Sequence, residues 1–475
     1  MQEADERVHT WGRRWRRRLC LILTMVPLGF LWPAVAVAGT TGKLIQRLGT
    51  DGCVSEDGTK GTCTDGHALF GAAMVAVSPD GHYVYVASFD SSAVTTFARN
   101  TITGVLGQLN GVAGCVSESG DGVTCGRGRG LNGAVAVAVS PDGQHLYIAS
   151  RGNAVAVFAR DTLTGKLAQL GGAAGCIVEA GDGVICSNGT ALVGLRAITV
   201  SPDGKSVYIG ARDGDAVVIL ARNSTTGALT QLSGPAGCVS ETSMGGLCTD
   251  GHGLLGARGV AVSPDNRHVY VAAQNNNAVV SFARDTTTGA LTQLPGLAGC
   301  IAENGDGITC ANGRGLKSPI HVAVSPDGQH VYVAARDSNA VVSFARDTTT
   351  GALTQLPGLA GCIAENGDGI TCAVGAGLRE AVFVTLSPDG TNLYVASQLS
   401  DAVAAFSRNA VTGALTQLPG VAGCVSDDGS DDGMAMVCAD GNGLLGALTV
   451  TVSPDGLNAY VASYISNALT VFNRQ

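Results

Sequence analysis

The sequence predicts an all-β fold, a seven-bladed β-propeller of four-stranded antiparallel blades, and three observations carry this prediction. A turn sequence, Ser-Pro-Asp-Gly, recurs at intervals of 61 to 66 residues. Each interval contains four short apolar stretches, and the last repeat lacks its fourth stretch. One supersecondary unit repeated at a fixed period is typical of propellers and solenoids. The seven turns begin at Ser78, Ser140, Ser201, Ser263 (followed by Pro-Asp-Asn), Ser325, Ser387 and Ser453.

The repeat that contains Ser325 shows the four predicted strands. Apolar stretches occupy residues 320–324, 331–335, 340–345 and 352–356, with turn residues between them. Proline at the second turn position fixes φ, and glycine supplies a positive φ. Each turn therefore predicts a hairpin between antiparallel strands, and four such strands make one blade.

The two ends of the chain complete one blade in this prediction. The last repeat stops at Gln475 after three strands, and residues 41–48 have the sequence of a fourth strand with no blade before it. We therefore expect the N-terminal strand to complete the last blade. Such closure leaves no open blade edge for another chain to pair with.

The first 38 residues differ from the repeats. Five arginines between Arg13 and Arg18 precede an apolar run from Leu19 to Val37, and small residues end the segment at Ala38. This is the layout of a secretory signal peptide. The run is also nearly long enough to span a bilayer, so an uncleaved anchor is the alternative. We predict a signal peptide at residues 1–38 and a propeller at residues 39–475.

Charge limits the partners of the mature chain. Without residues 1–38 the formal net charge changes from −9 to −12. An acidic body without a basic stripe repels phosphate backbones, which excludes nucleic acid as a partner. We expect a monomer that is secreted, periplasmic or on the cell surface, and that meets a membrane only through an uncleaved signal segment. Its ligand, an unknown protein, glycan or small molecule, is expected at the crown defined below or in the channel.

Fourteen of the 15 cysteines form local pairs, one per repeat, and Cys20 lies in the signal segment. An even count in an exported chain predicts disulfides. Zinc is excluded because the pairs lack histidine partners and Cys-x-x-Cys spacing. We expect the stapled hairpins, here called the crown, to lie between the fourth strand of one blade and the first strand of the next, and to rim one mouth of the channel. The pairs are Cys53–Cys63, Cys115–Cys125, Cys176–Cys186, Cys238–Cys248, Cys300–Cys310, Cys362–Cys372 and Cys424–Cys438.

The repeated motifs resemble those of the lactonase-like seven-bladed propellers. The resemblance rests on Val-Ala-Val-Ser-Pro-Asp-Gly at 322–328, Val-Tyr-Val-Ala at 331–334, Phe-Ala-Arg-Asp at 344–347 and Thr-Gly-Ala-Leu-Thr-Gln-Leu at 350–356. That family includes 6-phosphogluconolactonase and carboxymuconate-cyclase relatives and overlaps with the YVTN-type surface propellers. The resemblance covers the mature chain and implies the fold more strongly than an activity, because the repeated residues build turns and strands. The regular cysteine hairpins depart from the cytoplasmic enzymes of the family.

Catalysis in such a ring requires unlike residues that converge on the channel, so the informative positions are those where one blade differs from the others. His321 matches the inner-strand histidine of the family, and Arg258 and Arg196 stand in the corresponding part of other blades. Arg379 and Glu380 lead into a further inner strand. A lactonase would use His321 as base, Glu380 as acid or orienting group, and the three arginines as clamps for an acidic lactone. The alternative is that these are isolated polar residues at a solvated channel mouth.

The near-uniform blades favour binding over catalysis. Residues 277–311 and 339–373 are identical at all 35 positions, so these copies alone cannot supply two different catalytic roles. No Gly-x-Ser-x-Gly elbow, His-Glu-x-x-His helix or glycine-rich phosphate loop occurs, and we expect no cofactor. We therefore predict an exported β-propeller scaffold for binding or interaction. The alternative is a lactonase, a hydrolase or cyclase of lactone rings, acting at the central channel.

An acidic insert in the last cysteine hairpin is a weak candidate for a metal site. Asp427, Asp428, Asp431 and Asp432 offer the oxygen ligands that Ca²⁺ prefers. Their spacing does not match an EF-hand, and we expect a solvated loop tip. The sequence therefore predicts weak Ca²⁺ binding at most.

Overall fold

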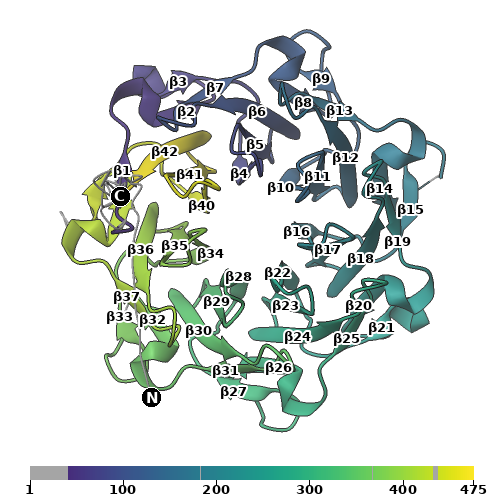
Figure 1. The fold of residues 1–475 in the computed structure, drawn as a ribbon, viewed down its shortest axis with the longest axis vertical. Helices are drawn as coiled ribbons and strands as arrows, with labels where there is room; N and C mark the ends of the chain where they lie inside the picture. The colour runs from purple at the N-terminus through teal and green to yellow at the C-terminus, as the bar shows by residue number, and fades with distance from the viewer. Residues whose placement is uncertain (1–40, 182, 366, 432–436) are drawn as a thin grey trace, which may run out of the picture. The chain divides into compact units, whose positions relative to one another are not determined.

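The computed structural model describes residues 41–475 apart from residues 182, 366 and 432–436. These residues form seven β-sheets arranged radially around a central channel (Figure 1). The predicted all-β, seven-bladed propeller is therefore confirmed. The signal peptide predicted at residues 1–38, with Cys20, lies outside the described residues. Blades are numbered 1 to 7 here in the chain order of their innermost strands.

The innermost strand of each blade lines the channel and begins with a β-bulge. In blade 5, Pro319 pairs with Ala335 but His321 pairs with Ala334, so Ile320 is the extra residue. The other six inner strands have the same register shift. Bulges re-aim side chains and are frequent beside active sites. The inner strands are β4 (Ala72–Val77), β10 (Ala134–Val139), β16 (Leu195–Val200), β22 (Ala257–Val262), β28 (Pro319–Val324), β34 (Ala381–Leu386) and β40 (Ala447–Val452).

Two strands, of six and seven residues, form the middle of each blade. The Ser-Pro-Asp-Gly turn leads into the second strand, and in blade 5 the Ser325 hydroxyl donates to Asp327 and accepts the His330 N–H. The second strands are β5 (Tyr83–Ser88), β11 (His145–Ser150), β17 (Ser206–Ala211), β23 (His268–Ala273), β29 (His330–Ala335), β35 (Asn392–Ser397) and β41 (Asn458–Ser463). The third strands are β6 (Ala93–Arg99), β12 (Ala154–Arg160), β18 (Ala216–Arg222), β24 (Ala278–Arg284), β30 (Ala340–Arg346), β36 (Ala402–Arg408) and β42 (Ala468–Arg474).

The outer part of each blade differs from the four-stranded prediction. In blade 5 the fourth strand covers only the C-terminal half of the third, pairing Leu353 with Arg346, and a fifth strand covers the N-terminal half, pairing Cys362 with Val342. The long third strand thus takes two short partners, and each sheet has six strands in place of four. The fourth strands are β7 (Leu106–Gln108), β13 (Leu167–Gln169), β19 (Leu229–Gln231), β25 (Leu291–Gln293), β31 (Leu353–Gln355), β37 (Leu415–Gln417) and β1 (Leu44–Gln46). The fifth strands are β8 (Cys115–Ser117), β14 (Cys176–Glu179), β20 (Cys238–Ser240), β26 (Cys300–Glu303), β32 (Cys362–Ala364), β38 (Cys424–Ser426) and β2 (Cys53–Ser55).

The stapled hairpins lie at the outer edge of the blades. All seven predicted disulfides are present. Each first cysteine starts a fifth strand, and the sixth strand beyond it lies at the perimeter of the ring (Figure 1). The expectation that the crown rims the channel mouth is therefore wrong, because the cysteines belong to the blade edge and not to a loop between blades. The sixth strands are β9 (Gly126–Arg127), β15 (Ser187–Gly189), β21 (Thr249–Asp250), β27 (Ala311–Gly313), β33 (Ala373–Val374), β39 (Ala439–Asp440) and β3 (Thr64–Asp65).

The helices of the described residues are short 3-10 turns. Seven join a fourth strand to a fifth, and two lie inside stapled hairpins. Within the described part of the chain, no helix has the length and apolar character of a membrane span. The first group is η1 (Gly49–Gly52), η3 (Gly111–Ala113), η4 (Gly172–Gly175), η5 (Gly234–Gly237), η7 (Gly296–Ala298), η8 (Gly358–Gly361) and η9 (Gly420–Ala422), and the second is η2 (Gly58–Gly61) and η6 (Ser243–Gly246).

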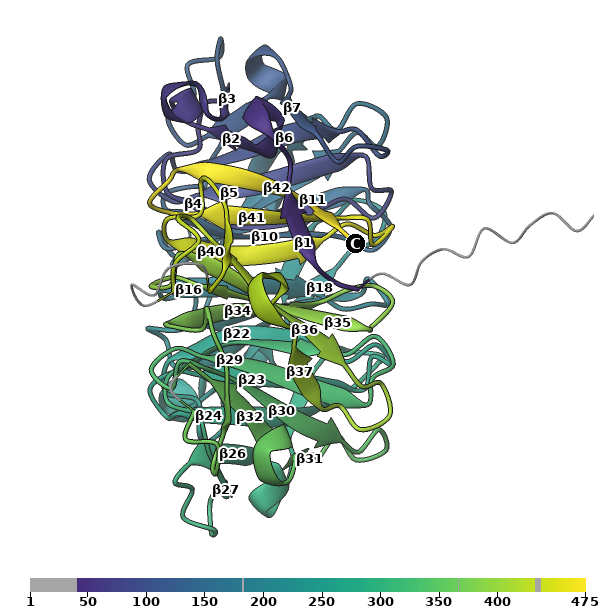
Figure 2. The same cartoon turned by 90° about the vertical axis from the view of Figure 1, so that its left-hand side faces the viewer.

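The N-terminal segment completes blade 7, as the sequence predicts. Leu44 of β1 pairs with Arg474 of β42, and Cys53 of β2 pairs with Thr470 of the same strand. Figure 2 shows β1 beside β42 at the edge of the ring. The segment supplies three strands where a single strand was expected, and it carries the predicted Cys53–Cys63 staple.

A buried arginine at the end of each third strand ties neighbouring blades together. Arg346 of blade 5 donates to the Tyr270 hydroxyl of blade 4 at 2.8 Å and to Asp265 at 2.7 Å. Tyr270, which is fully buried, donates in turn to the Gly351 carbonyl at 2.9 Å. Each such clamp satisfies a buried charge with fixed partners across a blade boundary. The other six ion pairs are Arg99–Asp455, Arg160–Asp80, Arg222–Asp142, Arg284–Asp203, Arg408–Asp327 and Arg474–Asp389.

Candidate functional site

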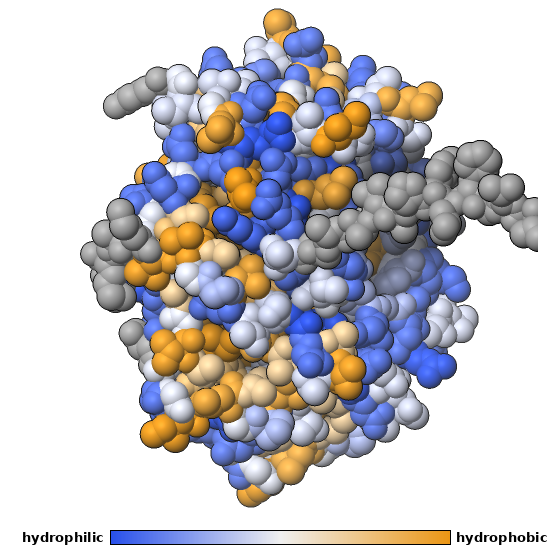
Figure 3. Space-filling view, turned by 60° about the vertical axis from the view of Figure 1, so that its left-hand side comes forward, coloured by the Kyte–Doolittle hydropathy of each residue, from blue (hydrophilic) through white to orange (hydrophobic). Residues whose placement is uncertain are grey.

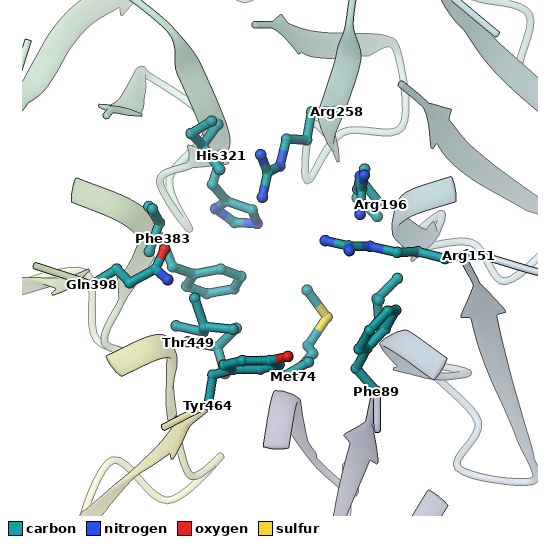
Figure 4. Close-up of a pocket in the computed structure, with 16 residues that line it drawn as sticks. Met74, Phe89, Arg151, Arg196, Arg258, His321, Phe383, Gln398, Thr449 and Tyr464 are labelled. Carbon is teal, nitrogen blue, oxygen red and sulfur yellow. The ribbon is translucent and has the colours of Figure 1, made fainter. Parts of the chain in front are cut away.

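A cavity of about 300 Å³ opens at one mouth of the channel (Figure 4). It lies where the inner strands begin and the second strands end, so a blade can contribute residues from both. The bulge lets consecutive residues of one inner strand, such as Ile320 and His321, line it together. The volume is at the lower end of the range for small-molecule pockets. The lining residues are Ala73, Met74, Phe89, Val135, Arg151, Arg196, Ala197, Arg258, Ile320, His321, Val382, Phe383, Gln398, Leu448, Thr449 and Tyr464.

His321 lies on the wall of this cavity and stacks on Phe383. Burial, aided by the charge of Arg258 and opposed by a hydrogen bond to the Val384 backbone, lowers the pKa of His321 to about 4. Its Nδ1 atom is buried and has no hydrogen-bond partner. The imidazole is therefore neutral at neutral pH, and one ring nitrogen has no hydrogen-bond partner within the described residues.

Two arginines from neighbouring blades face the same cavity. Arg258 Nη1 donates to Gln274 Oε1 at 3.2 Å, while Arg196 has two buried nitrogens, Nε and Nη1, without a partner. Burial, followed by the charge of Arg336 and other arginines, lowers the pKa of Arg258 to about 9, so it stays cationic at neutral pH. Among the described residues, no carboxylate forms an ion pair with Arg196 or Arg258. Figure 4 shows Arg258 beside His321.

Residues that follow the second strands complete the mouth. The Arg151 guanidinium lies 4.6 Å from the centre of the Phe89 ring, a cation–π distance. Burial, followed by the neighbouring Asp90 carboxylate, raises the pKa of the Tyr464 phenol. Tyr464 is therefore a neutral hydrogen-bond donor at neutral pH.

Three of the five predicted catalytic residues meet at the cavity. His321, Arg258 and Arg196 line it. Arg379 lines a separate hollow beside the last stapled hairpin, and Glu380 lines neither. Glu380 stands in the loop before β34 with a left-handed φ of 52°. The catalytic roles themselves stay predictions.

The acidic residues of the last stapled hairpin bind backbone groups of their own surroundings. Asp427 and Asp428 each accept a backbone N–H, at 2.7 and 2.9 Å. Asp431 is 2% exposed and accepts the Gly377 N–H at 2.9 Å, so it is not part of a solvated tip. Asp432 lies outside the described residues. In the part of the chain that the structure describes, no group of three His, Cys, Asp or Glu side chains is placed to hold a metal ion.

The sequence prediction missed one ring of site residues. Each second strand ends in a nearly constant sequence, and the next residue differs between most repeats. This switch from a constant strand end to a variable next residue was the signal that could have revealed the ring. Four of the seven residues at this position line the cavity. Two of the others, Arg212 and Arg336, form ion pairs at 2.8 Å with their chain neighbours. The seven are Phe89, Arg151, Arg212, Gln274, Arg336, Gln398 and Tyr464.

Comparison with known proteins confirms the resemblance that the repeats predict. The family model described as Lactonase, 7-bladed beta-propeller matches residues 311–360. A protein from Lactobacillus plantarum is similar in structure, with a TM-score of 0.51 and 18% identity over 78% of this chain and 86% of that chain. Proposed 6-phosphogluconolactonases from Bacteroides fragilis and Bacteroides uniformis both have a TM-score of 0.50 and 17% identity. The first match covers 79% of this chain and 85% of that chain, and the second 80% and 88%. At these identities the likeness concerns the fold, and no curated protein matches the chain.

Proposed function

We propose that this propeller, which resembles the seven-bladed lactonases and matches their family model over residues 311–360, hydrolyses a lactone that carries an anionic group. One observation carries the proposal. His321, Arg258 and Arg196 come from three neighbouring blades and converge on one cavity at the channel mouth. A neutral base and two cations that lack carboxylate partners are the groups that opening an acidic lactone requires.

His321 is the general base in this proposal. Its neutral imidazole takes a proton from water through Nδ1 as the water oxygen attacks the lactone carbonyl carbon. The carbonyl oxygen then carries the negative charge. When the ring C–O bond breaks, the imidazolium returns the proton to the leaving ring oxygen. The product is the open-chain hydroxy acid, which contains the atoms of the lactone and one water molecule.

The two arginines stabilise negative charge in the proposed reaction. Arg258, which lies beside His321, is the donor for the oxyanion, and the two unpaired nitrogens of Arg196 hold the anionic group of the substrate. Such donors are most effective where water is excluded, because the local dielectric constant is low. Cations without carboxylate partners also draw an anionic substrate into the mouth of an otherwise acidic protein.

The test is hydrolysis of a panel of lactones by the purified protein, followed by titration of the acid released. His321→Ala should lower kcat/KM by about a hundredfold or more without lowering the melting temperature. Blades 2 and 3 already carry Ala136 and Ala197 at this register position, so the fold accepts alanine there. The matched control is His330→Asn, on a second strand, where blades 6 and 7 carry asparagine. Hydrolysis that stays at background, or survives in His321→Ala, contradicts the proposal.

A second candidate function, a binding scaffold, is supported by the tips of the stapled hairpins. Several hairpins expose an aliphatic side chain two residues before the second cysteine: Val123 is 76% exposed, Ile308 82% and Ile370 83%. Figure 3 shows apolar side chains gathered in patches on the outer surface of the propeller. Repeated apolar tips on a rigid ring suit multivalent contact with a protein or glycan.

The scaffold proposal has its own experiment. Wild-type protein and the Ile308→Ser/Ile370→Ser variant are compared in pulldowns from the native cell envelope and medium. A partner retained by the wild type and lost by the variant supports a scaffold, and equal capture contradicts it. For both functions we propose a location in the periplasm, outside the cell or on its surface, and the seven disulfides support it because disulfides persist mainly in oxidising compartments.

A further inference from the structure

The channel cavity has a cationic side and an aromatic side. Figure 4 shows the two groups facing each other across the mouth. Blades 2 to 5 contribute Arg151, Arg196, Arg258 and His321. Blades 6, 7 and 1 contribute Phe383, Gln398, Thr449, Tyr464, Met74 and Phe89. A ligand that fills the cavity therefore meets guanidinium groups on one side and mainly aromatic or sulfur-containing side chains on the other.

The lining is rich in hydrogen-bond donors and poor in acceptors. Among the described residues, no aspartate or glutamate lines the cavity. Near the mouth, the Asp213 carboxylate already has a partner, because it accepts from Arg212 at 2.8 Å. Gln274 Oε1 accepts from both Arg258 and Arg212, so this acceptor is also occupied.

This balance argues against a polyhydroxylated ligand. A sugar acid brings several hydroxyl donors, and each needs an acceptor when it is buried. Of the lining side chains, Gln398, Thr449 and Tyr464 offer neutral oxygens, too few for such a set. The buried nitrogens of Arg196 need the opposite kind of group, an acceptor, and a carboxylate offers two acceptor oxygens in one plane.

The ring faces define the rest of the ligand. Phe383, Tyr464 and Phe89 present aromatic surface, and the Met74 thioether packs well against flat rings. We propose that the substrate is a carboxylate-bearing lactone built on an aromatic or other flat apolar ring, with its carboxylate at the arginines and its ring against the aromatic side. This substrate class rests on the proposed lactonase function, since it names the ligand of the same cavity.

Binding of stable acids tests the substrate class without requiring hydrolysis. Benzoate, cyclohexanecarboxylate and gluconate are titrated calorimetrically into the purified protein. The dissociation constant of benzoate should be at least about tenfold lower than that of gluconate, and it should also be lower than that of cyclohexanecarboxylate. Arg196→Met should weaken benzoate binding about tenfold, because it removes the unpaired donors. Phe383→Leu should weaken benzoate and leave cyclohexanecarboxylate nearly unchanged, and Tyr464→Leu serves the same purpose if Phe383→Leu does not fold.

A second arm separates this inference from the proposed function. Hydrolysis of coumarin-3-carboxylate, an aromatic lactone acid, is compared with hydrolysis of glucono-δ-lactone. Preference for the coumarin acid supports both proposals. Selective benzoate binding without hydrolysis of any lactone removes the lactonase and keeps the ligand class. Gluconate that binds as tightly as benzoate, or no binding by either acid, overturns the ligand class even if sugar lactones are hydrolysed.

Discussion

The imidazole of His321 lies against the ring of Phe383, with centroids 3.8 Å apart and planes inclined by 22°, although the two residues belong to adjacent blades. This stacking helps to bury the imidazole, and burial is the main cause of its low pKa of about 4. The contact therefore couples the packing between blades 5 and 6 to the protonation of the proposed base.

The pH dependence of hydrolysis should reflect this pKa. A general base acts when deprotonated, so kcat/KM should rise as the pH rises through about 4. It should reach its plateau well before pH 6.5, the pKa of an ordinary histidine. Phe383→Ala exposes the imidazole, which should raise its pKa and move the midpoint upward. The measurement is kcat/KM against pH for both proteins. A wild-type midpoint near 6.5 contradicts the buried base.

Breaking one clamp between blades should destabilise the propeller strongly. Arg346→Met leaves the Tyr270 hydroxyl and Asp265 without their cation. We expect the free energy of unfolding to fall by about 3 kcal/mol, the lower end for a broken buried pair because Asp265 is partly exposed. Urea unfolding measures this loss. The control is Asp337→Asn, which breaks an exposed pair with Arg336 and should cost under about 1 kcal/mol.

The clamp aspartates should also make stability fall in acid. Partial burial alone would raise the pKa of Asp265, but hydrogen bonds from Ser263 and Arg346 outweigh it and lower the pKa to about 2. An unfolded aspartate titrates near pH 3.9. The stabilisation is therefore fully present above about pH 4 and is lost as the pH falls towards 2. Melting temperatures between pH 6 and 2 should show this fall, and a shallower fall is expected for Asp265→Asn.

The staples of blades 4 and 5 should contribute equally. Residues 277–311 and 339–373 are identical, so Cys300→Ala/Cys310→Ala and Cys362→Ala/Cys372→Ala are matched variants. Each should lower the free energy of unfolding by about 2.5 kcal/mol, the loop-closure value for so short a loop. The two losses should add in the quadruple variant. Unequal losses in chemical denaturation show that position in the ring modifies the contribution of a staple.

Two residues occupy a backbone position that favours glycine. Just before the inner strand, Ser318 and Glu380 have φ values of 56° and 52°, and the other five blades have glycine there with φ near 70°. Replacing either residue by glycine should raise the free energy of unfolding by about 1 kcal/mol, because a left-handed conformation is costly with a Cβ. Thermal unfolding measures the gain. A loss of lactone hydrolysis in Glu380→Gly, but not in Ser318→Gly, favours a functional role for Glu380.

The fold followed from the sequence because its signals are local and repeated. Ser325 to Gly328 marks a hairpin regardless of what lies elsewhere, and seven copies predict a ring. The crown was misplaced because strand pairing depends on register, and nothing local shows that Cys362 pairs with Val342 on the same third strand as Leu353.

The candidate site was predicted in part. His321, Arg258 and Arg196 interrupt an apolar inner-strand pattern, so their difference from the other blades was visible. Arg151 and Tyr464 stand in turns, where sequence varies freely, and only the closed ring brings them to the same mouth.

Blade 7 joins segments from opposite ends of the chain, and the Thr41 hydroxyl bonds the Gln475 carbonyl at 3.0 Å across 434 positions. A partial chain cannot close the ring, because the N-terminal strands β1 and β2 pair with β42, the last strand to be synthesised. Since an unfinished ring leaves β42 without its partners β1 and β2, we expect ring closure to be the slow and aggregation-sensitive stage of folding. Because Thr41 lies beside Gln475, these two residues can be joined, and the chain reopened in a loop between other blades, without altering any strand pair. The blade in which the N-terminal and C-terminal segments meet is therefore set by the order in which the repeats are encoded, and not by the structure of the ring.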